Sequence, residues 1–348
     1  MVFKQQFKID GRYIGEGCDP YIIAEMSANH GNDISKAIDI IRQAKACGAD
    51  AIKIQTYTAD TLTLDCKSEA FEAKGAWKGE YLYDLYLRAS MPWEWTETLQ
   101  QVAKEESITL FSSPFDFSSI EFLEALGMPA YKIASPEIID LPLVRRIAQT
   151  KKPIIISTGG ATLVQISEAI SVLAEEGAED VAVLKCTSEY PAPPEKINLK
   201  TITHLKETFK CIVGLSDHTL GSAIPIASVG FGADIIEKHF IVSREDETAD
   251  SFFSATPEEL KSIVVGAKMV RAATGVVYYP EHGHLQRSLI AIRDINKGER
   301  LVDGENFKSL RPGGGIEPKN LDKVNGQEVV VDIRMGTLLS WDLISESA

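Results

Sequence analysis

Two histidines, His218 and His239, have the spacing expected of a shared metal site. His218 follows the apolar run 211–216, and His239 falls within the apolar run 234–241. If these runs are neighbouring parallel strands, both imidazoles emerge at one rim and can bind the same divalent cation. Two imidazoles leave coordination positions for water and substrate, which suits catalysis. The pair therefore predicts an enzyme that depends on Mn²⁺, Mg²⁺ or Co²⁺, with no organic cofactor.

Three lysines are expected near the same rim. Lys53, Lys132 and Lys185 each lie in a strand-like run, and buried ammonium groups need counter-charges. A small dianion that carries phosphate and carboxylate, such as phosphoenolpyruvate, would supply them. Serine hydroxyls would add donors, namely Ser113, Ser135, Ser157 and Ser216. Alternatively, each lysine pairs with a glutamate such as Glu25 or Glu137, but three lysines at strand ends favour the ligand.

The two-residue period of a strand decides which of these side chains share a face. Lys53 shares a side with Gln55, Ser216 with His218, and Glu237 with His239. Glu137 or Glu25 is the expected proton acceptor.

Eight apolar runs must position these residues. We expect strands at 21–28, 51–57, 109–114, 130–135, 153–158, 181–187, 211–216 and 234–241, with helix-patterned segments between them. Eight strand–helix units predict an α/β fold, the (β/α)8 TIM barrel. The rival is a doubly wound open sheet, but no GxGxxG turn follows the first run, which disfavours its dinucleotide-binding versions.

The chain is expected to form two domains. Residues 1–275 make up the predicted catalytic barrel, 276–288 a linker, and 289–348 a small tail of short strands and turns. An insertion at 58–92 follows the second strand and carries several aromatic residues. It predicts either a lid or wall of the active site, or an additional surface helix at 80–90.

Composition narrows the classes of partner and compartment. A net charge of −14 over 348 residues argues against nucleic acid and anionic membranes. Five cysteines without paired spacing fit a reducing compartment. The amino terminus lacks the apolar core of a signal peptide, and no stretch approaches the ~20 apolar residues of a membrane span. A cytoplasmic protein is therefore expected.

The motifs around these residues resemble the sialic acid synthase family along essentially the whole chain. The segments that carry the resemblance are 23–31, 51–57, 111–115, 131–137, 157–159, 184–191, 214–218 and 236–239. The tail, with residues 308–316, is similar to the antifreeze-like (SAF) domain of that family, a β-clip fold. Within the family the chain looks most like the pseudaminic acid branch. Lys185 stands where N-acetylneuraminate synthases more often carry histidine.

The resemblance implies a specific reaction. Phosphoenolpyruvate would condense with an open-chain acetamido sugar, 2,4-diacetamido-2,4,6-trideoxy-L-altrose in this branch. The products would be the nine-carbon keto acid pseudaminic acid and phosphate, which leaves by C–O cleavage. N-acetylneuraminate or legionaminate synthesis is the alternative within the family. A Schiff-base aldolase that uses Lys132 or Lys185 and a non-catalytic sugar-binding barrel are alternatives of other classes.

The resemblance also implies roles for individual residues. Lys53, Lys132, Ser113, Ser135, Ser157 and Ser216 match the phosphoenolpyruvate contacts of the family; Ser188 and Tyr190 match positions lining the sugar and phosphoenolpyruvate region; and Asp250 matches a sugar-contacting carboxylate. Gln55 and Lys185 complete the predicted substrate contacts. Glu137 would handle the proton of the attacking water, and Glu25 would lie near the sugar hydroxyls or metal-bound water. Arg311 would reach the active site of a partner subunit, which implies a domain-swapped homodimer.

Overall fold

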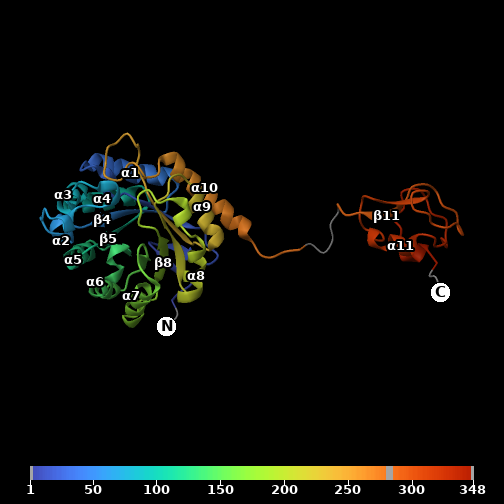
Figure 1. Ribbon diagram of the computed structural model, residues 1–348, viewed down its shortest axis with the longest axis horizontal. Coiled ribbons are helices and arrows are strands. Elements are labelled where there is room, and N and C mark those ends of the chain that lie inside the picture. Colours follow the sequence, from blue (N-terminus) through green and yellow to red (C-terminus); the bar gives the residue numbers. More distant parts are fainter. Residues whose placement is uncertain (1–2, 280–284, 346–348) are drawn as a thin grey trace. The chain divides into compact units, whose positions relative to one another are not determined.

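A computed structural model describes residues 3–279 and 285–345 of the chain. The chain divides into two compact units, residues 1–275 and 276–348 (Figure 1), and each is described by itself. Residues 280–284 of the predicted linker lie outside the described residues. Among the residues described, no helix combines the length and the apolar character needed to cross a membrane.

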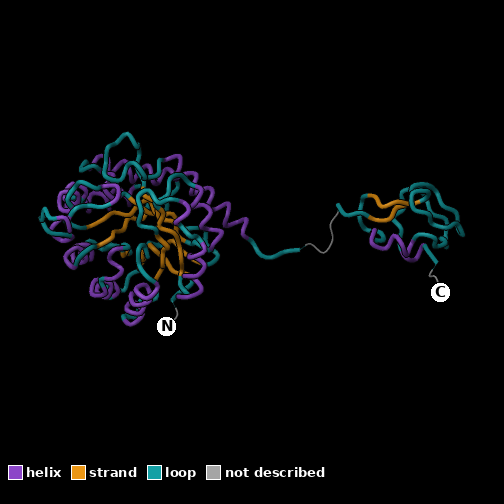
Figure 2. Tube along the Cα trace, viewed as in Figure 1, coloured by secondary structure: helices purple, strands orange, loops and turns teal. Residues whose placement is uncertain are grey.

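The first unit is a closed barrel of eight parallel strands (Figure 2). Its strands are β3 (Tyr21–Glu25), β4 (Ala51–Thr56), β5 (Thr109–Pro114), β6 (Tyr131–Ile133), β7 (Ile154–Ser157), β8 (Val181–Cys186), β9 (Ile212–Asp217) and β10 (Ile235–His239). The last strand, β10, pairs with both β9 and the first barrel strand, β3. The ring therefore has no edge, which confirms the predicted TIM barrel and excludes the open sheet.

Helices surround the barrel in the order that the alternating pattern predicts. They are α1 (Ile34–Cys47), α4 (Thr96–Glu105), α5 (Phe117–Ala125), α6 (Leu141–Ala148), α7 (Leu163–Glu175), α8 (Lys200–Phe209), α9 (Ala223–Ser228) and α10 (Pro257–Thr274). Local signals set their ends. In α1 the Asp33 side chain accepts a hydrogen bond from the Ser35 amide, and Gly48 ends the helix at a φ of 90°.

Side chains along each strand alternate between two apolar clusters. Residues such as Ile22 and Val183 pack outward against the helices, whereas Ile23 and Leu184 fill the barrel interior. An antiparallel hairpin, β1 (Gln6–Ile9) and β2 (Arg12–Gly15), adds three apolar side chains to the inner cluster. These are Phe7, Ile9 and Ile14. The hairpin therefore covers the amino end of the barrel and leaves its carboxyl end for polar side chains.

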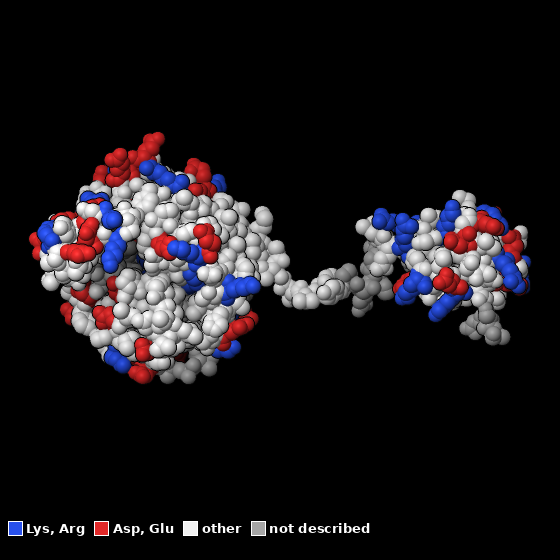
Figure 3. Space-filling model, in the orientation of Figure 1, with Lys and Arg blue, Asp and Glu red and all other residues white. Residues whose placement is uncertain are grey.

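The insertion after β4 contains α2 (Ala59–Leu62), two short turns of 3₁₀ helix, and α3 (Leu82–Ala89). The second unit has its own apolar core and pairs β11 (Ser288–Ala291) with β12 (Phe307–Leu310), followed by α11 (Leu321–Val324). On the face drawn in Figure 3, acidic and basic side chains are interspersed over each unit.

Candidate active site

Strand register gathers polar side chains inside the carboxyl end of the barrel. Glu25 lies opposite His239, and Ser216 opposite Glu237, in adjacent strands. In the other strands, the polar residues two positions beyond an inward-facing apolar residue also face inward. The inward-facing polar residues are Glu25, Lys53, Gln55, Ser113, Lys132, Ser157, Cys186, Ser216, His218, Glu237 and His239.

Two lysines meet at one carboxylate within this set. Lys53 Nζ lies 3.1 Å from Glu25 Oε2 and 3.2 Å from Glu237 Oε1, and Lys132 Nζ lies 3.4 Å from the same Glu237 oxygen. Burial opposes ionisation of Glu237, but Lys132 and Lys53 outweigh it and lower the pKa of that carboxyl. Burial raises the pKa of Glu25 to about 7. Two cations thus face one firmly ionised carboxylate, which makes the basin attractive to an anion.

Glu237 was predicted only to share a face with His239, and its place between two lysines was missed. The two-residue spacing from His239 was the available signal. The glutamate-pairing alternative is therefore correct in part, because Lys53 does contact Glu25. Glu137 plays no such part: its Oε2 atom is buried without a hydrogen-bond partner.

The prediction that Lys185 converges with the other two lysines is wrong. Its neighbours Val183 and Leu184 pack outside and inside the barrel respectively, so strand alternation turns Lys185 towards the helix layer. Its Nζ donates to the Cys186 carbonyl at 2.9 Å and to the Thr187 hydroxyl. Cys186 takes the inward position instead, with its Sγ 3.9 Å from His218 Nδ1.

His218 and His239 lie together, as predicted, with ring centroids 5.3 Å apart. His218 Nδ1 donates to the Thr187 carbonyl at 2.8 Å, so Nε2 carries the free lone pair. Burial and the neighbouring His218 lower the pKa of His239 well below its usual range, which keeps that imidazole neutral. Burial opposes protonation of His218, but Cys186 and the Thr187 carbonyl outweigh burial and raise the pKa of that imidazole.

The remaining ligands of such a metal would come from water or substrate. Within residues 3–279 and 285–345, no group of three or more His, Cys, Asp or Glu side chains is arranged to hold an ion. Asp250 Oδ2 lies 3.7 Å from His239 Nδ1. The two imidazoles nevertheless fit the donors of a catalytic divalent cation that keeps coordination positions open for water or substrate.

Several buried polar atoms around the basin lack protein partners. Examples are Ser157 Oγ and Glu137 Oε2, and burial raises the pKa of Glu137 to about 7. Nearby, the Gly159 amide donates to Ser135 Oγ at 3.0 Å, and a Cβ on Gly159 would lie 2.2 Å from Ser188 Oγ. Unsatisfied buried polar atoms in such close packing are typical of a site that binds a polar ligand.

A cavity of about 390 Å³ lies above the histidines. It is lined by four of the predicted substrate contacts and by His239; the four are Gln55, Ser188, Tyr190 and Asp250. The opposite side comes from the insertion, including Trp77 and Leu82. The insertion therefore lines this cavity, as the wall interpretation predicts, and it also contains a helix, α3, within the predicted range 80–90.

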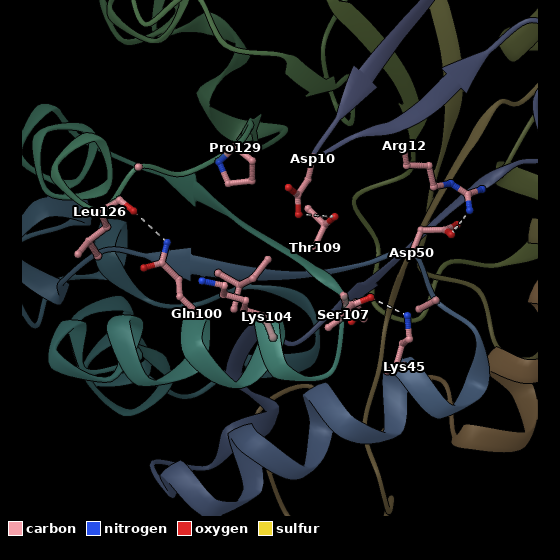
Figure 4. Close-up of a pocket in the computed structure, with 15 residues that line it drawn as sticks. Asp10, Arg12, Lys45, Asp50, Gln100, Lys104, Ser107, Thr109, Leu126 and Pro129 are labelled. Atoms are coloured by element: carbon pink, nitrogen blue, oxygen red, sulfur yellow. Dashed lines mark hydrogen bonds and ion pairs between the residues drawn. The ribbon is translucent and has the colours of Figure 1, made fainter.

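A larger cavity of about 850 Å³ lies at the amino end of the barrel (Figure 4). Its polar groups mostly satisfy one another. Arg12 pairs with Asp50, Lys45 donates to the Ser107 carbonyl, Thr109 donates to Asp10, and Gln100 donates to the Leu126 carbonyl. It contains none of the predicted site residues, which all lie elsewhere in the structure.

Arg311 lies in the second unit, where its side chain is exposed. Its role at the site of a partner subunit stays a prediction.

Comparisons with known proteins agree with this geometry. The NeuB family model matches residues 40–279 and the SAF domain model matches 286–345. The pseudaminic acid synthase of Helicobacter pylori is 41% identical over 336 residues, which are 94% of this chain and 98% of that protein. The pseudaminic acid synthase of Campylobacter jejuni is 43% identical over 326 residues, which are 92% and 95% of the two chains.

A solved structure is also similar. The crystal structure of N-acetylneuraminic acid (sialic acid) synthetase from Leptospira borgpetersenii, in complex with citrate, aligns with a TM-score of 0.73 and 28% identity. The alignment covers 82% of this chain and 95% of that one. The predicted family, the SAF domain and the enzymatic nature of the chain are confirmed: this chain belongs to the NeuB family of sialic acid synthase-type enzymes.

Proposed function

We propose that this enzyme condenses phosphoenolpyruvate with 2,4-diacetamido-2,4,6-trideoxy-L-altrose to give pseudaminic acid and phosphate. The observation that carries the proposal is the cationic basin of Lys53 and Lys132 around Glu237, a residue of the same strand, β10, as His239, whose ring lies 5.3 Å from that of His218. The similarity to two pseudaminic acid synthases supports the choice of sugar.

The basin would hold phosphoenolpyruvate. Its phosphate and carboxylate would pair with the ammonium groups of Lys53 and Lys132. Without a ligand, both ammonium groups contact the Glu237 carboxylate. Ser113 lies 3.4 Å from Lys53 Nζ, and Ser216 donates to Glu237. Ser113, Ser216, Ser135 and Ser157 would donate hydroxyl hydrogen bonds to the ligand, and the Ser157 hydroxyl has no partner within the protein. This contact set fixes the enol carbon for attack on the aldehyde.

Bond changes then follow in order. Carbon 3 of phosphoenolpyruvate bonds to the aldehyde carbon, whose oxygen takes a proton, and carbon 2 becomes electron-poor. Water adds to carbon 2, and the C2–O bond to phosphate breaks to leave the keto group. Glu137 is our choice for accepting the proton of that water, because burial brings its pKa to about 7, close to the working range of a base.

His218 and His239 would hold a divalent cation, Mn²⁺, Mg²⁺ or Co²⁺, with Glu25 and Asp250 near enough to orient water or sugar hydroxyls. Such an ion, when bound, would polarise the aldehyde oxygen and stabilise the negative charge that develops on it. The residues themselves position the sugar: Asp250 accepts a hydrogen bond from the Ala28 amide, which fixes its carboxylate beside His239.

A Schiff-base aldolase is the second candidate, favoured by one observation: burial lowers the pKa of Lys132, which would make its amine more nucleophilic. Lys185 faces the helix layer and is poorly placed for that role. Borohydride reduction in the presence of pyruvate would trap an adduct on Lys132 if this alternative holds. No adduct, together with loss of activity on chelation, would support the metal-dependent condensation.

The direct test is phosphate release from phosphoenolpyruvate with a panel of sugars. We expect 2,4-diacetamido-2,4,6-trideoxy-L-altrose to be used in preference to its legionaminate-series isomer and to N-acetylmannosamine. Preference for N-acetylmannosamine would replace our proposal with N-acetylneuraminate synthesis. If no sugar leads to phosphate release, the proposal that this enzyme catalyses the condensation is wrong.

A further inference from the structure

We propose that one face of α3 selects the sugar by receiving the methyl group at C6 and the acetamido methyl group at C4. The inference rests on the proposed function and deepens it, because it assigns sugar discrimination to residues of the 58–92 insertion. None of these residues was among the predicted site residues.

The helix presents an apolar stripe to the 390 Å³ cavity. Leu82, Leu85, Tyr86 and Ala89 all line the cavity, and their spacing of three, four and seven residues places them on one helical face. Leu87, on another face of the same helix, is 60% exposed and does not line the cavity. The stripe is therefore directed at the cavity rather than distributed around the helix.

Other parts of the insertion extend this surface. Ala73 is buried and Trp77 is half-buried at the cavity wall. Lys74 also lines the cavity, but its side chain is exposed, so its ammonium group can remain in solvent. Apart from Lys74 and the hydroxyl group of Tyr86, the insertion thus presents the cavity with an apolar surface.

The rest of the cavity is lined by strand ends and their loops. These include the polar side chains of Gln55, Ser188, His239 and Asp250 beside the apolar Ala28, Pro136 and Ala249. A ligand that fits both sides must be polar at one end and apolar at the other. The aldehyde end of the sugar belongs beside His239, where the chemistry takes place, so its far end faces α3.

N-acetylmannosamine, one of the two competing sugars, differs from the proposed substrate in the groups at that far end. The diacetamido-trideoxy sugar carries a methyl group at C6 and an acetamido group at C4. N-acetylmannosamine carries hydroxyl groups at both positions. A hydroxyl placed against apolar side chains loses its hydrogen bonds to water without gaining new ones, whereas a methyl group gains contact area. The wall therefore favours the C6 methyl group over a hydroxyl group, and it gives the methyl end of the C4 acetamido group an apolar contact that a C4 hydroxyl group cannot use.

The wall is anchored, which such discrimination requires. Trp77 Nε1 donates to the Ala249 carbonyl at 3.0 Å, and the Trp77 ring packs 5.3 Å from the Tyr190 ring. At the other end, Asn32 Nδ2 donates to the Arg88 carbonyl at 3.0 Å. These contacts tie the insertion to the loops after β3, β8 and β10, so α3 cannot retreat freely from a misplaced hydroxyl.

The test compares Leu82→Asn with Leu87→Asn, the same substitution on the same helix outside the cavity. For Leu82→Asn we expect kcat/KM for the diacetamido-trideoxy sugar to fall by about ten- to two-hundred-fold. The change should come through KM for the sugar, with KM for phosphoenolpyruvate unchanged. Leu87→Asn should retain wild-type kinetics. Equal kinetics for Leu82→Asn and wild type would overturn the inference while leaving the proposed function intact.

A second measurement leaves the protein unaltered, in case Leu82→Asn does not fold. The wild-type enzyme is offered 2,4-diacetamido-2,4-dideoxyaltrose, which differs from the proposed substrate only by a hydroxyl at C6. We expect kcat/KM at least about ten-fold lower than for the 6-deoxy sugar. Equal use of both sugars would overturn the inference. Failure of the enzyme to use either sugar would instead overturn the proposed function.

Discussion

Glu237 and Lys53 form a buried ion pair across the barrel interior, with Nζ 3.2 Å from Oε1 and each side chain at most 6% exposed. The same oxygen lies 3.4 Å from Lys132 Nζ and accepts a hydrogen bond from Ser216 Oγ at 3.1 Å. One carboxylate therefore positions both ammonium groups that we assign to phosphoenolpyruvate.

Replacing Glu237 with glutamine should destabilise the fold. The substitution leaves Lys132 without its ion-pair partner and Lys53 with Glu25 alone, and breaking a buried pair typically costs about 3–5 kcal/mol. Denaturant unfolding would measure the loss. Glu175→Gln is the control: its pair with Arg145 is exposed, so we expect a change of at most about 1 kcal/mol.

The same variant tests the basin as an anion site. Because phosphoenolpyruvate would supply the missing negative charge, it should raise the melting temperature of Glu237→Gln by more than that of the wild type. An equal or smaller shift in the variant would contradict the placement of the dianion between Lys53 and Lys132.

Activity should fall on the acid side as Glu137 becomes protonated. Burial raises its pKa to about 7, and a base must be ionised to accept a proton. Glu137→Gln should lower kcat by about 10²–10⁴-fold and remove this acid limb from the pH–rate profile. Glu168→Gln, on the exposed side of α7, should change neither. An unaltered acid limb in Glu137→Gln would assign the proton to another group.

The raised pKa of Glu137 also has a consequence for stability. A carboxyl with a higher pKa in the folded state than in the unfolded state binds its proton more tightly when folded. Its contribution to stability is therefore complete below the ordinary pKa of 4.5 and is lost as the pH rises through about 7. Unfolding free energies measured across this range should fall more steeply in the wild type than in Glu137→Gln.

Periodicity was sufficient to predict the barrel, because eight apolar runs are buried on both faces and helix-patterned segments separate them. It was not sufficient for the hairpin at 6–15, whose short strands are half exposed and carry a weak alternating signal. The inward series Lys53–Gln55 and Glu237–His239 followed from the two-residue period. Lys185 was misplaced because its position in a strand-like run, rather than its phase within that run, decided the prediction.

Side-chain pairing was the harder part of the site. That Glu237 would serve two lysines depends on the register between strands distant in sequence, which no local pattern encodes. The wall formed by α3 was foreseen only as one of two options, because an amphipathic helix buries its apolar face equally well against a core or above a cavity.

Removing either imidazole should weaken metal binding, because each supplies one of the two protein ligands that we propose. We expect His239→Ala to bind Mn²⁺ at least about ten-fold more weakly than the wild type, by titration calorimetry, and to lose metal-stimulated phosphate release. His204→Ala, on the exposed face of α8, is the matched control and should bind Mn²⁺ normally. Wild-type affinity in His239→Ala, or full activity after exhaustive chelation, would contradict the proposed metal site.

Subunit mixing tests the proposed domain-swapped homodimer. Arg311→Ala should weaken sugar use more than phosphoenolpyruvate binding, and His218→Ala should be inactive. A mixed dimer contains one Arg311→Ala subunit and one His218→Ala subunit. If Arg311 acts on the site of the partner, the site of the Arg311→Ala subunit keeps its own His218 and receives an intact Arg311 from the other subunit. Activity at limiting sugar should therefore reappear when the two variants are unfolded and refolded together. If Arg311 serves its own subunit, every site in the mixture lacks one residue, and mixing restores nothing.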